Sequence, residues 1–231
     1  KIPCVFITHQ LEIKTPYFTN KIQKLNYNYI NKFDACWIVD DKEGNLAGEL
    51  SKPTNLPKKT TYIGRQSRFK HQKLEKKYDF LAIVSGPEPQ RTIFEKGIIK
   101  AFKKRKEKSL IVLGKPESKT KQEINNLTIK SHLNAKDLNH AILQSDLIIC
   151  RSGYSTIMDL EKLGKKAFLI PTPGQTEQEY LAKKLHQKNI CYSQSQNKFD
   201  FEKAIIESKK YTGFSKVKEQ ERNWEKLFSL F

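Results

Sequence analysis

Short, mostly apolar runs alternate along the chain with segments whose apolar residues recur at helical spacing. The clearest runs lie at residues 80–84, 109–113, 127–129, 147–150 and 166–170. Runs of this length are typical of strands buried on both faces of a sheet. The segments with helical spacing lie at about 90–105, 136–144, 178–188 and 201–209. This alternation predicts an α/β fold, in which a Rossmann-like parallel sheet carries helices on both faces.

The first sixty residues carry a smaller version of the same pattern. An apolar run at 2–8 begins almost at the first residue, so we expect the chain to begin inside a domain. A helix at about 16–32 and a strand at 34–39 follow, and the polar residues 40–60, with their glycines and prolines, predict loops or a linker. The strand and helix alternation restarts at Thr61.

Polar turns follow two consecutive strands of the predicted sheet, those at 147–150 and 166–170. Ligands of open α/β sheets bind at this carboxyl edge. In the first turn, Gly153 lets a ligand approach the backbone, and the helix that begins there presents free N–H groups that suit a phosphate. The hydroxyl groups of this turn belong to Ser152, Ser155 and Thr156.

A further turn, from Ser85 to Arg91, ends one predicted strand and opens a helix. It contains Gly86 and Gln90 but neither the Gly-x-Gly-x-x-Gly nor the Gly-Lys-Ser pattern of familiar nucleotide-binding loops. Its exposed N–H groups can bind a diphosphate, with Arg91 as a charged partner. An ordinary tight turn is the alternative interpretation.

Acidic and amide side chains open the helices after the two polar turns. Asp159 follows Thr156 within the helix, where a carboxylate can accept hydrogen bonds from both hydroxyls of a ribose. The alternative is an acid favoured there by the helix dipole alone. Gln175, Glu177 and Gln178 can bind sugar hydroxyls or can form a solvated first helical turn.

His9 ends the first predicted strand, again at a carboxyl edge. A lone histidine is more often structural than catalytic. The four cysteines show neither a Cys-x-x-Cys pair nor a spacing suited to zinc. We therefore expect buried reduced thiols, no metal and no cofactor.

The chain carries a formal net charge of +18 at pH 7. A solvated lysine-rich surface is the interpretation that we favour, followed by attraction to an anionic membrane surface. Nucleic acid is an unlikely partner, because the basic residues are scattered and do not alternate with aromatic ones. No apolar run is long enough to cross a bilayer. We expect a soluble cytoplasmic protein, with peripheral attachment to the inner face of the membrane as an option.

Taken together, these motifs resemble those of MurG-type glycosyltransferases, which belong to family 28 and have the GT-B fold. The family's Arg-Ser-Gly-x-x-Thr-x-x-Glu motif is similar to Arg151 to Asp159, where aspartate replaces the glutamate. Its Pro-rich turn with paired Gln residues is similar to Pro171 to Gln178, where Glu177 replaces one Gln. The resemblance is most specific over 145–182 and implies the C-terminal half of a GT-B fold.

The resemblance implies that the candidate residues bind a UDP-sugar donor. Asp159 would hold the ribose, the backbone near Asn134 and Ala135 would read the uracil, and Arg68 would contact the donor. The implied donor-binding residues are Arg68, Ser85, Gly86, Gln90, Arg91, Asn134, Ala135, Ser152, Gly153, Ser155, Thr156, Asp159, Gln175, Glu177 and Gln178. The catalytic base stays unknown, and His9 is a weak candidate.

The resemblance also implies a domain organisation. Residues 1–60 would be the remnant of an N-terminal, acceptor-side domain with its linker, and 61–212 would form the donor-binding domain. A C-terminal helix within 213–231 would cross back to the N-terminal part. About a hundred residues of the acceptor domain would be absent, which is a typical length for a small domain.

The function implied is transfer of a sugar, for example N-acetylglucosamine, from a UDP-sugar to a lipid-linked or glycan acceptor. The resemblance implies an inverting, metal-independent reaction. Two alternatives use the same residues: a UDP-sugar hydrolase of related fold, and a non-catalytic module that binds nucleotide sugars.

Overall fold

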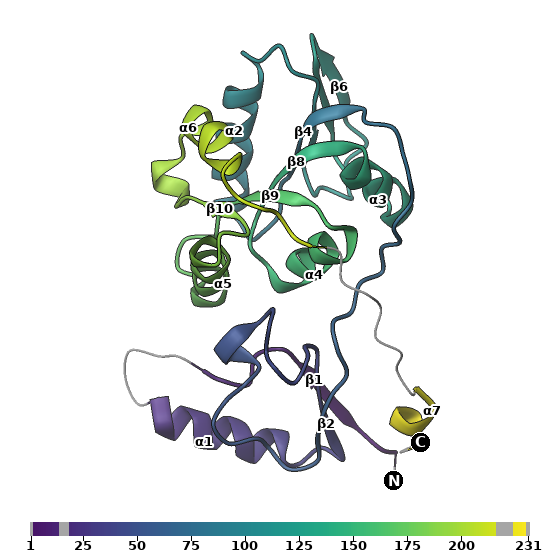
Figure 1. Ribbon diagram of the computed structural model, residues 1–231, viewed down its shortest axis with the longest axis vertical. Coiled ribbons are helices and arrows are strands. Elements are labelled where there is room, and N and C mark those ends of the chain that lie inside the picture. Colours follow the sequence, from purple (N-terminus) through teal and green to yellow (C-terminus); the bar gives the residue numbers. More distant parts are fainter. Residues whose placement is uncertain (1, 14–18, 216–223, 230–231) are drawn as a thin grey trace. The chain divides into compact units, whose positions relative to one another are not determined.

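The computed structural model describes residues 2–13, 19–215 and 224–229 of the chain (Figure 1). The chain divides into two compact units. Unit 1 comprises Lys1–Gln66 with Lys218–Phe231, and unit 2 comprises Ser67–Val217. The units divide after Gln66, six residues beyond the boundary expected at 60, because the strand at Thr60–Tyr62 pairs with the sheet of unit 1.

Unit 1 is built on a parallel sheet with the strand order β1-β2-β3 among its described residues. Its elements are β1 (Val5–Thr8), α1 (Thr19–Ile30), β2 (Ala35–Ile38), η1 (Gly48–Leu50), β3 (Thr60–Tyr62) and α7 (Trp224–Phe228). Every residue of β2 is buried, so this strand packs on both faces. Cys36 and Ile38 pack with Leu11 and Ile30, and Trp37 packs on the opposite side with Ile63.

The C-terminal helix of unit 1 contacts the sheet at Trp37. The ring centroids of Trp37 and Phe228 lie 5.5 Å apart in an edge-to-face arrangement, and Leu227 packs on the same cluster. The rest of the helix expected at about 215–229 falls partly outside the described residues, as does the start of the helix expected at 16–32.

Unit 2 is built on one sheet whose described strands follow the order β10-β9-β8-β4-β5-β7-β6. The strands are β4 (Tyr78–Ile83), β5 (Ser109–Val112), β6 (Lys121–Ile124), β7 (Leu127–Lys130), β8 (Ser145–Cys150), β9 (Lys166–Leu169) and β10 (Tyr192–Ser193). All neighbouring pairs are parallel except β6 with β7. The predicted parallel α/β sheet is confirmed, and β6 and β10 are additions that the apolar pattern did not indicate.

Helices cover both faces of this sheet (Figure 1). They are α2 (Gln90–Phe102), α3 (Ala135–Leu143), α4 (Tyr154–Leu163), α5 (Thr176–Gln187) and α6 (Phe201–Ser208), with the short η2 (Gln196–Lys198). Phe102 of α2 and Phe201 of α6 share a buried cluster with Phe80 of β4, which fixes these two helices on one face. Figure 1 shows α3 on the other face.

The strand register brings four strand ends to one edge of the sheet. Ile83 of β4 pairs with Val112 of β5 and with Cys150 of β8, and Cys150 pairs with Leu169 of β9. The chain runs outward from β4 in one direction through β5 and β7, and then in the other through β8, β9 and β10. The topological switch point, where ligands of open α/β sheets bind, therefore lies between the carboxyl ends of β4 and β8.

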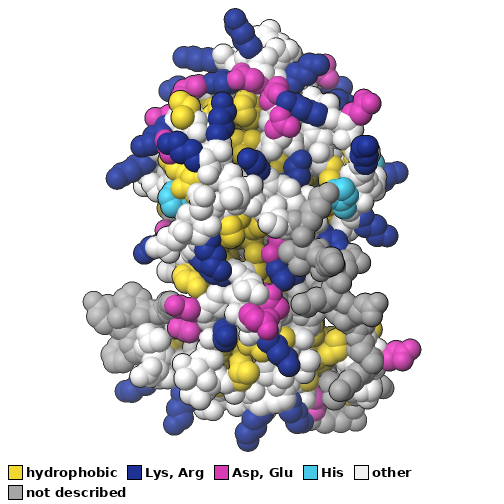
Figure 2. Space-filling model, in the orientation of Figure 1, with side chains coloured by type: hydrophobic (Ala, Val, Ile, Leu, Met, Phe, Trp, Pro, Cys, Tyr) yellow, Lys and Arg dark blue, Asp and Glu magenta, His cyan; other side chains and the backbone are white. Residues whose placement is uncertain are grey.

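On the face that Figure 2 shows, the positive charge is dispersed. Figure 2 shows Lys and Arg side chains spread over the visible face with Asp and Glu among them. Within the described ranges, no helix combines the length and apolar character that a bilayer crossing needs.

Cys36, Cys150 and Cys191 are buried free thiols, whereas Cys4 is exposed, contrary to the expectation that all the thiols are buried.

Candidate functional site

The first turn of α4 forms the middle of the candidate site. Gly153 occupies the N-cap position, and no side chain of the described residues caps the helix there. A Cβ built on Gly153 would meet no atom within 4 Å, so the space in front of this backbone is open. Ser155 is exposed and Thr156 is half-buried. A helix start with open space and uncapped N–H groups is suited to an anion.

Arg151 lies directly before this turn, and its side chain is buried, with 2% of it exposed. Nη1 donates to the carbonyl oxygens of Ile170 at 3.1 Å and Pro171 at 3.2 Å. Nη2 donates to the carbonyl of Gln90 at 2.9 Å and to Oε1 of Gln196 at 2.5 Å. One guanidinium thus ties the end of β9 to the start of α2 and to η2.

The charge of Arg151 has no carboxylate partner among the residues that the structure describes. Its neighbours are neutral oxygens and the ring of Phe94, whose centroid lies 4.3 Å from the guanidinium carbon. Burial lowers the pKa of Arg151 to about 10, which leaves the group charged at neutral pH. A buried charge without a counter-charge costs free energy, and it gives this edge of the sheet a positive potential that suits an anionic ligand.

The turn after β4 lies beside Arg151. The carbonyl of Ser85 is 3.5 Å from Nε of Arg151, and Gly86 has φ +109°, a conformation that favours glycine. Gln90 opens α2 and is held by Arg151 through its carbonyl and by Gln196 through Oε1, at 2.6 Å. Arg91, by contrast, forms an ion pair with Glu88 in the same turn.

The turn after β9 is fixed by side chains of α5. Ser152 donates its hydroxyl to the carbonyl of Gln178 at 2.7 Å, and Oε1 of Gln178 accepts the N–H of Thr172 at 3.0 Å. Nε2 of Gln178 donates to Oε1 of Gln175 at 2.6 Å. Glu177 is half-buried at the same helix start. The structure therefore brings Ser152, Gln175 and Gln178 together, through bonds that shape the turn itself.

Asp159 of α4 contacts a residue that the sequence analysis did not single out. Ser67 donates its hydroxyl to Oδ1 of Asp159 at 2.5 Å and accepts the N–H of Phe69 at 3.1 Å. Burial raises the pKa of the Asp159 carboxyl, and the Ser67 hydrogen bond and the charge of Arg68 partly oppose that rise. Ser67 and Asp159 lie 92 residues apart, so no local pattern indicates this pair.

Two further candidates of unit 2 lie away from the switch point. Asn134 follows β7 and caps α3 by accepting the N–H of Asp137 at 2.9 Å, and Ala135 is the first residue of that helix. Because β5 separates β7 from β4, these two residues occupy the same edge two strands away. His9 follows β1 and belongs to unit 1.

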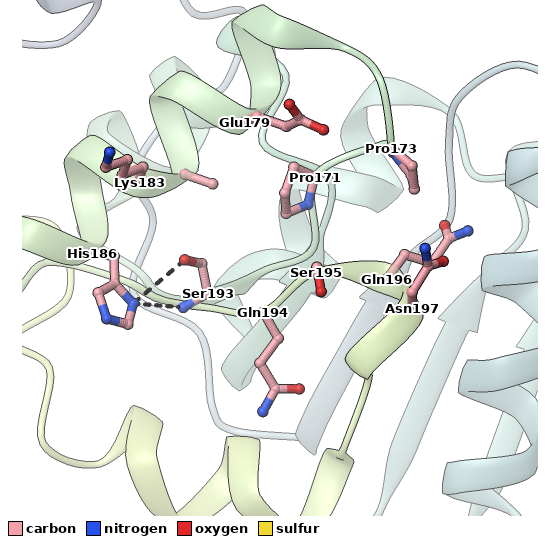
Figure 3. A pocket seen from close by; sticks show the side chains of 11 residues that line it. Pro171, Pro173, Glu179, Lys183, His186, Ser193, Gln194, Ser195, Gln196 and Asn197 are labelled. Atoms are coloured by element: carbon pink, nitrogen blue, oxygen red, sulfur yellow. Dashed lines mark hydrogen bonds between the residues drawn. The ribbon is translucent and has the colours of Figure 1, made fainter.

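A groove of about 450 Å³ lies beside the site between α5 and the segment after β10 (Figure 3). Its lining residues are Pro171, Pro173, Glu179, Ala182, Lys183, His186, Ser193, Gln194, Ser195, Gln196 and Asn197. Nδ1 of His186 accepts the N–H of Ser193 at 3.2 Å, and the Tyr211 hydroxyl lies 3.0 Å from Nε2. None of the predicted donor-binding residues lines the groove, but Gln196 connects it to Arg151.

Comparison with known proteins identifies the sequence pattern. A family model described as the glycosyltransferase family 28 C-terminal domain matches residues 80–226. These residues include the turns after β4, β8 and β9 that form the candidate site. A comparison with curated proteins finds no match.

Solved structures of glycosyltransferases share the fold. The glycotransferase of kitacinnamycin has a TM-score of 0.58 at 14% identity, over 90% of this chain and 62% of the other. The spinosyn rhamnosyltransferase SpnG complexed with thymidine diphosphate has a TM-score of 0.57 at 13% identity, over 92% of this chain and 60% of the other. MurG of Acinetobacter baumannii has a TM-score of 0.50 at 17% identity, over 88% of this chain and 56% of the other. The likeness confirms the expected Rossmann-like half of a GT-B fold, and the chain spans about three fifths of these proteins.

Proposed function

The chain belongs to glycosyltransferase family 28 through its C-terminal domain, and from this premise we propose that unit 2 binds a nucleotide-sugar donor for sugar transfer. The observation that carries the proposal is the buried charge of Arg151 beside the uncapped start of α4. Both features lie at the switch point of the sheet and both favour a phosphate group. A nucleoside diphosphate supplies two such groups next to a sugar.

The proposed roles follow the position of each residue. The diphosphate lies against Gly153 and the Ser85–Gly86 turn, where the helix start and Arg151 stabilise its negative charge as it leaves the sugar. Asp159 accepts hydrogen bonds from the ribose hydroxyls and keeps its bond from Ser67. The nucleobase of the donor lies near Asn134 and Ala135, and Arg68 is the cation that contacts the donor. The sugar lies near Gln175, Glu177 and Gln178.

The proposed donor is a UDP-sugar, possible sugars including N-acetylglucosamine, and the proposed acceptor is a lipid-linked or glycan hydroxyl. The reaction that we propose is of the MurG type, inverting and independent of a metal. In that reaction a general base removes the proton of the acceptor hydroxyl while the diphosphate departs. His9 is kept as a weak candidate for a group near the acceptor.

Docking on an anionic membrane surface at the cytoplasmic side is part of the proposal. Support comes from α1, where Ile22, Leu25 and Tyr29 are 37%, 57% and 59% exposed along one helix face. The exposed Lys24 belongs to the same helix and the exposed Lys32 follows its end, a combination that suits an interfacial helix. Binding to vesicles that contain phosphatidylglycerol, weakened by Leu25→Glu, is the expected result. Equal sedimentation with neutral and anionic vesicles would contradict it.

Two alternatives share the donor site and differ in the products. A hydrolase of related fold releases free sugar and UDP without an acceptor, whereas a non-catalytic module binds the donor and leaves it intact. Incubation with UDP-N-acetylglucosamine, followed by chromatography of nucleotide and sugar, separates these outcomes. Release of free sugar without an acceptor supports the hydrolase.

Calorimetric titration with UDP, thymidine diphosphate and GDP tests the proposed donor site. We expect micromolar binding of the pyrimidine nucleotides and weaker binding of GDP. Asp159→Ala should weaken the binding of UDP roughly fivefold or more through loss of the ribose hydrogen bonds. Asp146→Ala is the matched control, because Asp146 lies at the opposite end of β8 and pairs with Lys76. Absence of binding by all three nucleotides would refute the donor site.

A further inference from the structure

The hydroxyl of Thr172 is a polar group of the candidate site that has no partner among the described residues. Thr172 lies in the turn between β9 and α5, and 1% of the residue is exposed. Its Oγ1 is buried and forms no hydrogen bond with any residue that the structure describes. Folding tends to satisfy or exclude such groups, because a buried hydroxyl that loses its bonds to water destabilises the folded chain.

The backbone groups of Thr172 itself are hydrogen-bonded, in contrast to its side chain. The N–H of Thr172 donates to Oε1 of Gln178 at 3.0 Å, and its carbonyl accepts the N–H of Gln175 at 3.1 Å. The neighbouring N–H of Gly174 donates to Glu179 at 3.0 Å. A turn with this degree of order holds the Thr172 side chain in one place.

Thr172 faces the turn after β4. A Cβ built on Gly86 would have Oγ1 of Thr172 as its nearest neighbour, at 3.5 Å, with Nε of Arg151 at 4.0 Å. Pro171 and Pro173, on either side of Thr172, line the neighbouring groove instead (Figure 3). The hydroxyl therefore lies beside a glycine without a side chain, and the guanidinium of Arg151, which lacks a carboxylate partner in the described ranges, lies near the same glycine.

We propose that Thr172 contacts the donor and that its hydroxyl donates a hydrogen bond to an oxygen of the diphosphate. The inference rests on the proposed function and adds a residue to it. Arg151 makes the local potential positive, which favours an anionic oxygen over a sugar hydroxyl at this position. Gly86 places no side chain beside this hydroxyl, and the donated bond strengthens as negative charge accumulates on the departing diphosphate.

A buried water molecule is the competing explanation, and it predicts a different response to substitution. Thr172→Val keeps the shape of the side chain and removes the hydroxyl, whereas Thr172→Ser keeps the hydroxyl. Loss of a bound water changes stability and leaves ligand affinity unchanged. Loss of a phosphate contact changes the affinity for nucleotides that carry the diphosphate and spares the nucleoside.

The test is calorimetric titration of both variants with UDP and with uridine, together with urea unfolding followed by far-UV circular dichroism. Thr128→Val is the matched control, because Thr128 lies in β7 away from the site. We expect Thr172→Val to weaken UDP binding roughly fivefold to tenfold, and Thr172→Ser to bind UDP within about threefold of the wild-type affinity. The affinity for uridine should be unchanged in both variants. The valine variant should unfold at the same or a higher urea concentration.

The outcomes separate this proposal from the donor site itself. UDP affinity within twofold of wild type in Thr172→Val, or an equal loss for uridine and UDP, would overturn the role of Thr172 alone. If the wild-type chain binds neither UDP nor thymidine diphosphate, the proposed donor site fails, and the role of Thr172 fails with it.

Discussion

Replacement of Arg151 by methionine tests whether one buried cation holds the candidate site together. Methionine has a similar length and removes the charge and all the donors. Four hydrogen bonds of 3.2 Å or less would be lost, to Ile170, Pro171, Gln90 and Gln196, together with the longer one of 3.5 Å to Ser85. At about 1 kcal/mol of net stabilisation for each of the four shorter bonds, the loss is about 4 kcal/mol. The variant also no longer has the desolvation cost of a buried charge, which offsets part of this loss, so we expect a net destabilisation of about 2–3 kcal/mol.

The assay must report on unit 2, and intrinsic fluorescence does not. Both tryptophans of the chain, Trp37 and Trp224, belong to unit 1. Urea unfolding followed by far-UV circular dichroism registers mainly α2 to α6 of unit 2, which contain more helical residues than α1 and α7 of unit 1. Tryptophan fluorescence in the same samples then serves as an internal control, because Arg151→Met should leave the transition of unit 1 in place.

Two further variants complete the test of Arg151. Arg151→Lys keeps the charge but not the planar set of donors, so it should recover some nucleotide binding and less than half of the lost stability. Arg105→Met is the control, since Arg105 is 16% exposed and pairs with Glu107 and Glu202 away from the site. It should leave nucleotide affinity unchanged. If Arg151→Met unfolds within 0.5 kcal/mol of wild type, a difference typical of neutral surface changes, the reasoning is wrong.

Other variants separate folding from binding. Gly86→Ala places a side chain at φ +109° and should lower the unfolding free energy by roughly 1–3 kcal/mol, as measured by urea titration. Gly153→Ala meets no neighbour and should weaken UDP binding without loss of stability, so an unchanged affinity would argue against close backbone approach. Burial raises the pKa of Asp159, so the native fold favours its protonated form, and that contribution declines as pH rises above about 4. Relative to Asp159→Asn, the wild-type chain should therefore lose stability between pH 4 and 7; a flat difference would contradict this.

The apolar runs predicted the strands of unit 2 that are buried on both faces, because burial leaves a direct signal in the sequence. Two strands of unit 2, β6 and β10, left no such signal in the sequence. β6 carries three exposed polar residues in four and joins the sheet through pairing with β7, and β10 is two residues long. Such elements exist because of their neighbours, and a local pattern cannot indicate them.

The candidate site likewise combines residues that the sequence pattern indicated with residues that it did not. The turns after β8 and β9 were recognisable because small and polar residues interrupt apolar runs at the strand ends. The inward direction of Arg151 was not predictable, since an arginine at a strand end normally reaches solvent. Ser67 and Thr172 gain their significance from contacts made across the fold, to Asp159 in one case and to the Gly86 turn in the other.

The two edges of the sheet in unit 2 bear on aggregation. An open edge strand is a template on which another chain can add a strand. β6 presents charged and amide side chains there, including the Lys121–Glu123 ion pair at 2.8 Å, and β10 offers only two residues for pairing. Neither edge gives a second copy enough backbone for stable strand addition. The sheet of unit 2 is therefore poorly suited to fibril-like association through its edges.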